Sequence, residues 1–401
     1  MASRAVTVPR TRSGSWWYAA LSVCAVGWGA NQFASLLPFY RLELAVGMPT
    51  VQATFGLYAA GLIPGLLVGG PISDRHGRRR VVLPALAISL AATVVLTLGL
   101  HGVGWLFVGR FVAGVASGAA FSAGTAWIKE LSSAPYADAP DGAGARRATI
   151  AMTTGFGVGP LVAGVLAQWG PAPGVLPYVP HLVLAAVAVP LAWRTPETVI
   201  TSASDQERGA VTAHRHPRFL RVVVPLAPWV FGGATIALAY LPGLVASRVH
   251  GLAMAFGGLA SLVTAMAGVL VQPVARRIDR PGSRRLLVAA LTTMTAGLLL
   301  AAVAATVRHP AAVLVAAVVL GVGYGGCMVC GLTEVTRLAA PRELGALTAL
   351  FQAVTYLGFA APFLLAALQA VAPPGVLLVA VAALALLTLV WTAREARRRP
   401  A

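Results

Sequence analysis

One loop between two apolar stretches has the composition of an ion-pair network. It reads Gly70-Pro-Ile-Ser-Asp74-Arg75-His76-Gly77-Arg78-Arg79-Arg80. Asp74 can accept hydrogen bonds from a helix N-terminus, where the helix dipole favours an anion, and Gly77 permits a tight turn. The arginines can pair with Asp74 or Glu130, or act only as anchors at a membrane surface. We expect Asp74 and Arg75 to form a gating latch toward the apolar stretch that begins near Glu343. The predicted network comprises Gly70, Asp74, Arg75, Gly77, Arg78, Arg79 and Glu130.

Arg110 lies inside an apolar stretch that is long enough to cross a membrane. An arginine in that position costs at least about 2.5 kcal/mol, so it normally faces a partner or a cavity. We interpret Arg110 as a positive charge in a central cavity, where it contacts a substrate or tunes a proton site. The alternative is that its long side chain extends to the nearer membrane surface.

Amide and aromatic side chains deep in apolar stretches are further candidates for a substrate cavity. Gln352 and Tyr356 are four residues apart, so they share one face of a helix. A cavity with few charges and several aromatic and amide groups suits an amphipathic, largely apolar substrate. Packing or interfacial aromatic residues are the alternative. The cavity candidates besides Arg110 are Asn31, Gln32, Trp229, Tyr240, Tyr324, Gln352 and Tyr356.

The acidic residues do not support a mid-membrane proton carrier, because all 12 lie at or beyond the ends of apolar stretches. Glu43, Glu130 and Glu334 are the remaining candidates. Cys327 and Cys330 form a C-x-x-C pair without further ligands, so we expect packing residues and no metal. His101, His250 and His309 are interpreted as loop residues. The sequence has no nucleotide-binding P-loop and no catalytic constellation, so it predicts neither an enzyme nor a cofactor.

The amino-acid composition predicts a protein that is embedded in a membrane. The chain has 401 residues, of which 58% are hydrophobic and 10% charged, whereas soluble domains carry about 25% charged residues. Helices that span a bilayer need about 20 mostly apolar residues. Twelve such stretches are predicted, so the chain is expected to be an all-α integral membrane protein. They are 16–38, 50–72, 81–100, 103–128, 149–169, 175–193, 222–246, 252–274, 286–306, 311–333, 344–369 and 375–392.

The net charge of +18 is explained by topology. If the N-terminus is cytoplasmic, nearly all arginines fall in cytoplasmic segments, and only Arg41, Arg248 and Arg308 fall outside. Cytoplasmic loops of membrane proteins carry such an excess of basic residues. We therefore predict a multi-pass protein of a bacterial inner membrane with both termini in the cytoplasm, and no nucleic-acid partner.

Two halves of the chain repeat one pattern. Asp74 and Asp279 open similar loops, and the glycine run Gly114-Val-Ala-Ser-Gly118 recurs as Gly321-Val-Gly-Tyr-Gly325. Parallel duplication of this kind places a transport site between two related bundles. The predicted division is a six-helix bundle over residues 1–193, a polar cytoplasmic linker over 194–218 and a second six-helix bundle over 219–401.

The loop from Gly70 to Arg80 resembles the signature loop of the major facilitator superfamily, G-x-x-x-D-R-x-G-R-[RK]-[RK], at every position. The second copy is degenerate, with Ala275 in place of its first glycine. Arg110-Phe-Val-Ala113-Gly114 resembles the R-x-x-Q-G element, with alanine in place of glutamine. The resemblance covers the whole chain and implies twelve transmembrane helices in two pseudo-symmetric bundles.

A third element resembles the G-x-x-x-G-P-x-x-G-G motif of drug and proton antiporters, with Ala163 in place of one glycine. Its small residues allow close helix packing, and its proline removes a backbone hydrogen bond and can kink the helix. Tight packing without any directional meaning is the alternative. The element comprises Gly155, Gly159, Pro160 and Gly164.

These features predict a secondary active transporter that works by alternating access. The resemblance favours export of small hydrophobic or amphipathic compounds, such as drugs or natural products, driven by proton antiport or another ion gradient. The alternative is import of a small metabolite or sugar. The expected partners are a small-molecule substrate and the lipid bilayer, and a monomer is expected to be sufficient.

Overall fold

The computed structural model describes residues 14–140, 142–199, 213–280, 282–340 and 343–398. Twelve helices in these ranges are long and apolar enough to cross a membrane, as predicted. Several extend beyond the predicted apolar stretches, because a helix continues past the bilayer into water. The predicted arginines of residues 1–13 and the middle of the predicted linker, residues 200–212, lie outside the described residues.

The first half is helical from Trp16 to Trp193, apart from short connections. The first span is broken, because its α-helix gives way to a 3₁₀ segment, η1, at Gln32. The elements of this half are α1 (Trp16–Asn31), η1 (Gln32–Leu36), α2 (Leu37–Glu43), α3 (Met48–His76), α4 (Arg78–Thr97), η2 (Leu98–His101), α5 (Val103–Leu131), α6 (Ala143–Trp169), η3 (Leu176–Tyr178) and α7 (Val179–Trp193).

The second half repeats this plan, and its first span contains two π-helical segments, η5 and η6. Its last span but one is broken by the 3₁₀ segment η8. The elements of this half are η5 (Phe219–Val223), α8 (Val224–Thr235), η6 (Ile236–Tyr240), α9 (Leu241–Leu244), η7 (Ala246–Arg248), α10 (Ala253–Leu270), α11 (Gln272–Ile278), α12 (Arg285–Val307), α13 (Pro310–Leu338), α14 (Leu344–Tyr356), η8 (Leu357–Ala360), α15 (Ala361–Leu368) and α16 (Pro374–Arg398).

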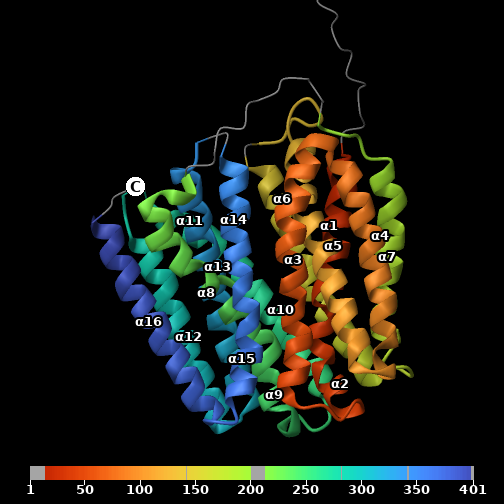
Figure 1. Ribbon diagram of the computed structural model, residues 1–401, viewed down its shortest axis with the longest axis vertical. Helices are drawn as coiled ribbons and strands as arrows, with labels where there is room; N and C mark the ends of the chain where they lie inside the picture. Colours follow the sequence, from red (N-terminus) through yellow and green to blue (C-terminus); the bar gives the residue numbers. More distant parts are fainter. Residues whose placement is uncertain (1–13, 141, 200–212, 281, 341–342, 399–401) are drawn as a thin grey trace, which may run out of the picture.

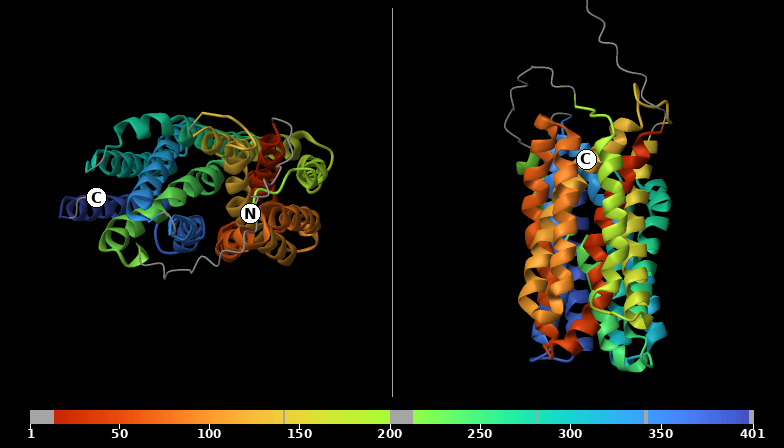
Figure 2. Two further views of the ribbon diagram at one scale, coloured as in Figure 1. Left: turned by 90° about the horizontal axis from the view of Figure 1, so that it is seen from above. Right: turned by 90° about the vertical axis from the view of Figure 1, so that its right-hand side faces the viewer.

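The two halves stand side by side, with their long helices running roughly along one axis (Figures 1 and 2). Helix α6 packs against α10 of the other half, and α3 packs against α14 and α15. The end of the molecule at which α3 ends and α4 begins also carries Arg218, Arg337 and Arg398. We call this end the arginine-rich side, and the opposite end, where α3 and α10 begin, the arginine-poor side.

The repeated glycine runs perform the same task in both halves. A Cβ atom on Gly114 of α5 would overlap the backbone carbonyl of Tyr58 in α3. A Cβ atom on Gly325 of α13 would likewise overlap the backbone carbonyl of Gly268 in α10. Small residues at such crossings let two membrane helices approach closely. The repeat seen in the sequence therefore corresponds to two equivalent helix crossings.

Candidate transport site and charge networks

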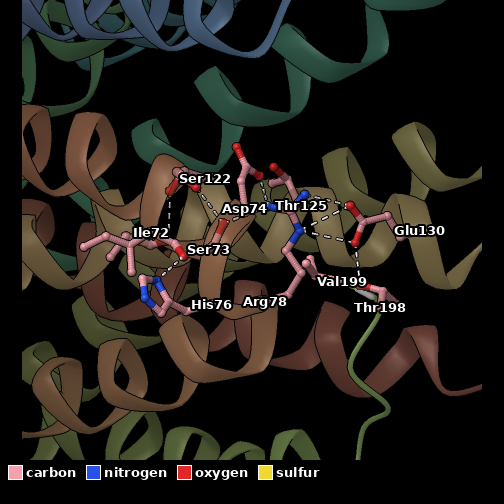
Figure 3. Close-up of polar contacts among 12 residues, drawn as sticks. Ile72, Ser73, Asp74, His76, Arg78, Ser122, Thr125, Glu130, Thr198 and Val199 are labelled. Carbon is pink, nitrogen blue, oxygen red and sulfur yellow. Dashed lines mark hydrogen bonds and ion pairs between the residues drawn. The ribbon is translucent and has the colours of Figure 1, made fainter. Parts of the chain in front are cut away.

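Arg78 is the centre of a charge network on the arginine-rich side of the first half (Figure 3). Its guanidinium pairs with Asp74 one turn earlier in α3. It donates to the Ser73 hydroxyl at 2.7 Å and to Glu130 of α5 at 2.8 Å. The Thr198 hydroxyl donates to the same glutamate. The network thus joins α3, α4, α5 and the start of the linker.

This network differs in part from the predicted latch. Asp74 pairs within its own half in this conformation, so its expected approach to the segment near Glu343 stays a prediction. Arg75 makes no ion pair within the described parts of the chain. A Cβ atom on Gly70 would lie 3.7 Å from the side chain of Ser122 in α5, which is an ordinary contact distance.

Glu197, which the sequence pattern does not single out, occupies the place expected for Asp74 at a helix N-terminus. Its carboxylate accepts the backbone N–H groups of Arg78 at 2.7 Å and Arg79 at 3.0 Å. Gly77 precedes this helix start with φ of 107°, and a Cβ atom there would overlap that carboxylate. Asp74 cannot cap α4 because it lies in the last turn of α3. No local pattern marks Glu197, since it is more than a hundred residues from Arg78 and Arg79 in the sequence.

The second half has its own charge network on the same side. Arg218 donates to both carboxylate oxygens of Glu334, at 2.6 and 2.8 Å. Arg337 pairs with Asp279 at 2.8 Å and lies 3.6 Å from Glu334. The hydrogen bond to Glu334 raises the pKa of Arg218 above its ordinary value. Glu334 is therefore a structural partner of two arginines in this conformation.

Arg110 is fully buried, so the alternative in which it reaches the membrane surface is wrong. Its guanidinium donates to the carbonyl of Ala30 at 2.7 Å, beside the break in the first span. The guanidinium carbon lies 5.0, 5.5 and 4.5 Å from the ring centroids of Phe33, Phe55 and Tyr58. Such cation–π contacts are worth about 2 kcal/mol or more when desolvated. Arg110 is thus held in an aromatic enclosure made by α1, η1 and α3.

An aromatic cluster joins this enclosure to the second half. Phe55 stacks on Phe359 with ring centroids 5.4 Å apart. Phe231 stacks on Tyr356 at 4.7 Å and lies 5.6 Å from Tyr324. The predicted residues Tyr324 and Tyr356 therefore both contact Phe231. The phenylalanine partners were missed because an apolar residue in a membrane helix gives no local signal. The aromatic cluster comprises Phe55, Tyr58, Phe231, Tyr324, Tyr356 and Phe359.

The other predicted cavity residues are dispersed. Asn31 donates to the carbonyl of Phe156 in α6, whereas its neighbour Gln32 turns toward α4. Tyr240 accepts a hydrogen bond from a glutamine near the arginine-poor side at 2.8 Å. Trp229 is buried in α8. Gln352 is half-buried, one turn before Tyr356.

The predicted element of the fifth span packs in two directions. A Cβ atom on Gly155 would overlap the backbone of α1, and one on Gly159 would lie 3.1 Å from Trp28 of that helix. A Cβ atom on Gly164 would overlap the carbonyl of Met254 in α10, and Pro160 lies against Gly258 of the same helix. The element therefore joins the first span to the opposite half of the molecule.

Hydrogen bonds between the halves are found toward the arginine-poor side. Gln52 donates to the carbonyl of Ala239 at 2.8 Å. Gln168 donates to the carbonyl of Gly251 and accepts the N–H of Met254 at 3.3 Å. By contrast, each charge network on the arginine-rich side joins helices of a single half. Among the described residues, the hydrogen bonds between the halves thus lie toward one end of their interface.

Twelve spans in two packed halves, with an aromatic cluster at their interface, define a membrane transporter fold. A family model of the Major Facilitator Superfamily matches residues 19–362 and, in a second match, 239–400. The chain belongs to this family.

Relatives and structures agree with this assignment. An uncharacterized MFS-type transporter of Mycobacterium tuberculosis, MT3072, is 28% identical over 339 residues, which is 81% of this chain and 73% of that protein. The multidrug resistance protein MdtL of Klebsiella pneumoniae is 26% identical over 102 residues, 25% of this chain and 26% of MdtL. The crystal structure of a point mutant of the nucleoside transporter NupG superimposes with a TM-score of 0.73 at 12% identity, over 95% of this chain and 99% of NupG. That likeness concerns the fold alone.

Proposed function

We propose that the protein exports small hydrophobic or amphipathic compounds from the cytoplasm by alternating access. The observation that carries this proposal is the aromatic cluster, which bridges the halves beside the buried cation Arg110. Aromatic faces bind flat apolar molecules without requiring a particular hydrogen-bond pattern. The partial similarity to MdtL, named a multidrug resistance protein, supports the same substrate class.

The distribution of charge and of contacts between the halves is compatible with the proposed direction of transport. The arginine-rich side is taken as cytoplasmic, because basic residues accumulate on that side of a membrane. The halves are fastened toward the opposite side by Gln52 and Gln168. In this conformation a substrate would enter from the cytoplasm, which is one step of an export cycle. Residues 1–193 and 219–401 would move as units about the linker 194–218.

Transport into everted membrane vesicles tests this function. Vesicles from cells that express the full chain are energised and offered ethidium, Hoechst 33342, uridine and glucose. We expect uptake of the two dyes and its collapse on addition of an uncoupler. Accumulation of a probe only in right-side-out vesicles would overturn the proposed direction, and accumulation of uridine or glucose in right-side-out vesicles would favour the importer alternative.

A pair of variants tests the role of the aromatic cluster. Phe231→Ala removes the ring that contacts both Tyr356 and Tyr324. The substitution should reduce dye transport about tenfold, because stacking of a flat aromatic molecule on an aromatic side chain is worth about 1–3 kcal/mol. Phe363→Ala is the matched control, because this ring is on the exposed surface of α15. Equal effects of the two substitutions would exclude the cluster as the substrate site.

A further inference from the structure

A second polar group is enclosed within the first half, away from the aromatic cluster. His181 lies in the first turn of α7, near the arginine-poor side, and is fully buried. Its Nδ1 is 2.9 Å from the hydroxyl of Thr93 in α4, and its Nε2 is 3.4 Å from the hydroxyl of Ser89. An ionisable residue inside a membrane span is costly and usually has a function. From the sequence, only histidines in loops were interpreted.

The hydrogen bonds form a chain with a direction. Gln32 donates its amide N–H to the Thr93 hydroxyl oxygen over 3.4 Å. The Thr93 hydrogen is then free to point at Nδ1 of His181, which acts as an acceptor. This arrangement fits a neutral ring whose proton is on Nε2, facing Ser89. The tautomer of a histidine is set by the bonds of its two nitrogens in this way.

The same hydrogen-bonded group also contains the acceptor that a doubly protonated His181 ring would need. A doubly protonated His181 donates from Nδ1 to Thr93, whose own hydrogen must then find another acceptor. The Oε1 atom of Gln32 is buried and has no hydrogen-bond partner among the described residues. A half-turn of the Gln32 amide places this oxygen opposite the Thr93 hydroxyl. A buried charge is tolerated only when its donors are satisfied, and this chain can satisfy them by reversing its direction.

The hydrogen-bonded side chains of Gln32, Thr93 and His181 lie against the part of the first span that touches the opposite half. His181 lies directly against Gly29 of α1, where a Cβ atom would be only 2.5 Å from Nε2. Gln32 begins the 3₁₀ segment η1, and Ser35 of that segment lies against Gly257 of α10. A reversal of these hydrogen bonds would therefore change the contacts at the break in the first span and at the interface between the halves.

The surroundings contain no acid that would hold a proton in place of His181. Among the described residues, α1, η1, η3, α4 and α7 include no aspartate or glutamate. Their other titratable groups are Tyr18, Cys24, Tyr178 and the arginines 78–80 at the far end of α4. The neighbouring intramembrane cation is Arg110, which bonds Ala30 next to Gly29. It opposes a second charge, so a bound proton would be released readily.

We propose that His181, Thr93 and Gln32 form a proton-binding site through which a proton gradient drives the transport cycle. The site lies near the arginine-poor side, from which protons would enter during export. The coupling to a substrate rests on the proposed function, whereas proton binding itself does not. In this proposal the ring of His181 is the proton carrier of the transport cycle.

Reconstituted protein tests the coupling. Proteoliposomes with an acidic interior and a clamped membrane potential receive the full chain, and ethidium accumulation and ethidium counterflow are both measured. His181→Gln should lose at least tenfold of the accumulation driven by the pH gradient while counterflow, which needs no gradient, continues. His101→Gln, an exposed histidine on the same side, should resemble the unmodified protein. Accumulation by His181→Gln at the unmodified level would overturn the proposal.

A measurement without substrate separates failure of this site from failure of the proposed function. The full chain is labelled with ¹⁵N-histidine in lipid nanodiscs, and the His181 signal is assigned by its loss in His181→Gln. We expect this ring to become doubly protonated between pH 8 and about pH 5, and we expect Gln32→Leu to move the transition to lower pH. A ring that stays neutral at pH 5 would overturn the site even if ethidium is transported. A titrating ring in a protein that does not transport ethidium would sustain the site and reject only the substrate class.

Discussion

The two halves of the protein use similar charges in different arrangements at their arginine-rich ends. In the first half, Arg78 of the loop itself links Asp74 to Glu130. In the second half the aligned position is Ser283, and Arg337 of α13 pairs with Asp279 and Glu334 instead. An aspartate and a glutamate are thus joined by an arginine in both halves, although the arginine comes from a different helix.

The two networks also differ in burial. Arg78, Asp74 and Glu130 are 12%, 62% and 34% exposed. Arg218 and Glu334 are 5% and 8% exposed. Exposed ion pairs contribute about 0–1 kcal/mol each, whereas removing one partner of a buried pair costs about 3–5 kcal/mol. We infer a division of work between the networks: the buried second network stabilises the second bundle, whereas the exposed first network can break and re-form during the transport cycle.

The largest expected effect is on the second network. Glu334→Gln removes the carboxylate that accepts two hydrogen bonds from the buried Arg218, so it should lower the free energy of unfolding by about 3–5 kcal/mol. Glu130→Gln, the equivalent change in the first half, should lower it by about 1 kcal/mol. Denaturation of the purified proteins in detergent, followed by tryptophan fluorescence, measures both. Equal losses would contradict the division of work between the networks.

The next effect concerns the two equivalent loop glycines. Gly77 and Gly282 have φ of 107° and 72°, so alanine is strained at both positions by about 1–3 kcal/mol. A Cβ atom at Gly77 would also meet the Glu197 carboxylate, whereas Gly282 has open space. Gly77→Ala should therefore destabilise the protein more than Gly282→Ala in the same denaturation experiment. The reverse order would mean that Glu197 does not hold this turn.

The sequence was sufficient to predict the twelve spans, because length and apolar composition determine them. The repeated glycines were also informative, since a small residue is needed wherever two backbones cross, as at Gly114 and Gly325. Asp74, Arg78 and Glu130 were recognised as one network because the loop and the end of α5 had to lie on one side of the membrane.

The remaining site residues depend on how each helix is rotated about its own axis. Phe231 and Phe359 are identical in local pattern to lipid-facing aromatic residues, and only the packed structure shows that they meet. His181 follows a proline at the start of a span, where a loop histidine would look the same. Glu197 acts through a contact with a distant helix start. Such partners are set by tertiary packing, which residue spacing alone does not describe.

A smaller effect is expected at the starts of α4 and α12. Glu197 accepts two backbone N–H groups at the start of α4, whereas Ser283 accepts only that of Arg285, at 3.2 Å, at the start of α12. Loss of a cap costs about 0.5–2 kcal/mol. Glu197→Ala should lie at the upper end of that range and Ser283→Ala at the lower end, measured by denaturation. A larger loss for Ser283→Ala would show that the linker does not stabilise the first half.

The smallest effect on stability, but a clear one on transport, is expected from Asp74→Asn. The Asp74 side chain is largely exposed, so its pair with Arg78 should contribute no more than about 1 kcal/mol to folding. If the first network opens and closes during the cycle, loss of this charge should slow ethidium counterflow severalfold. Asp138→Asn is the control, since this aspartate lies on the same side outside the network. An unchanged counterflow rate in Asp74→Asn would reject the gating role. A loss in the free energy of unfolding well above about 1 kcal/mol would mean that the Asp74–Arg78 pair stabilises its bundle as much as Arg218 and Glu334 stabilise theirs.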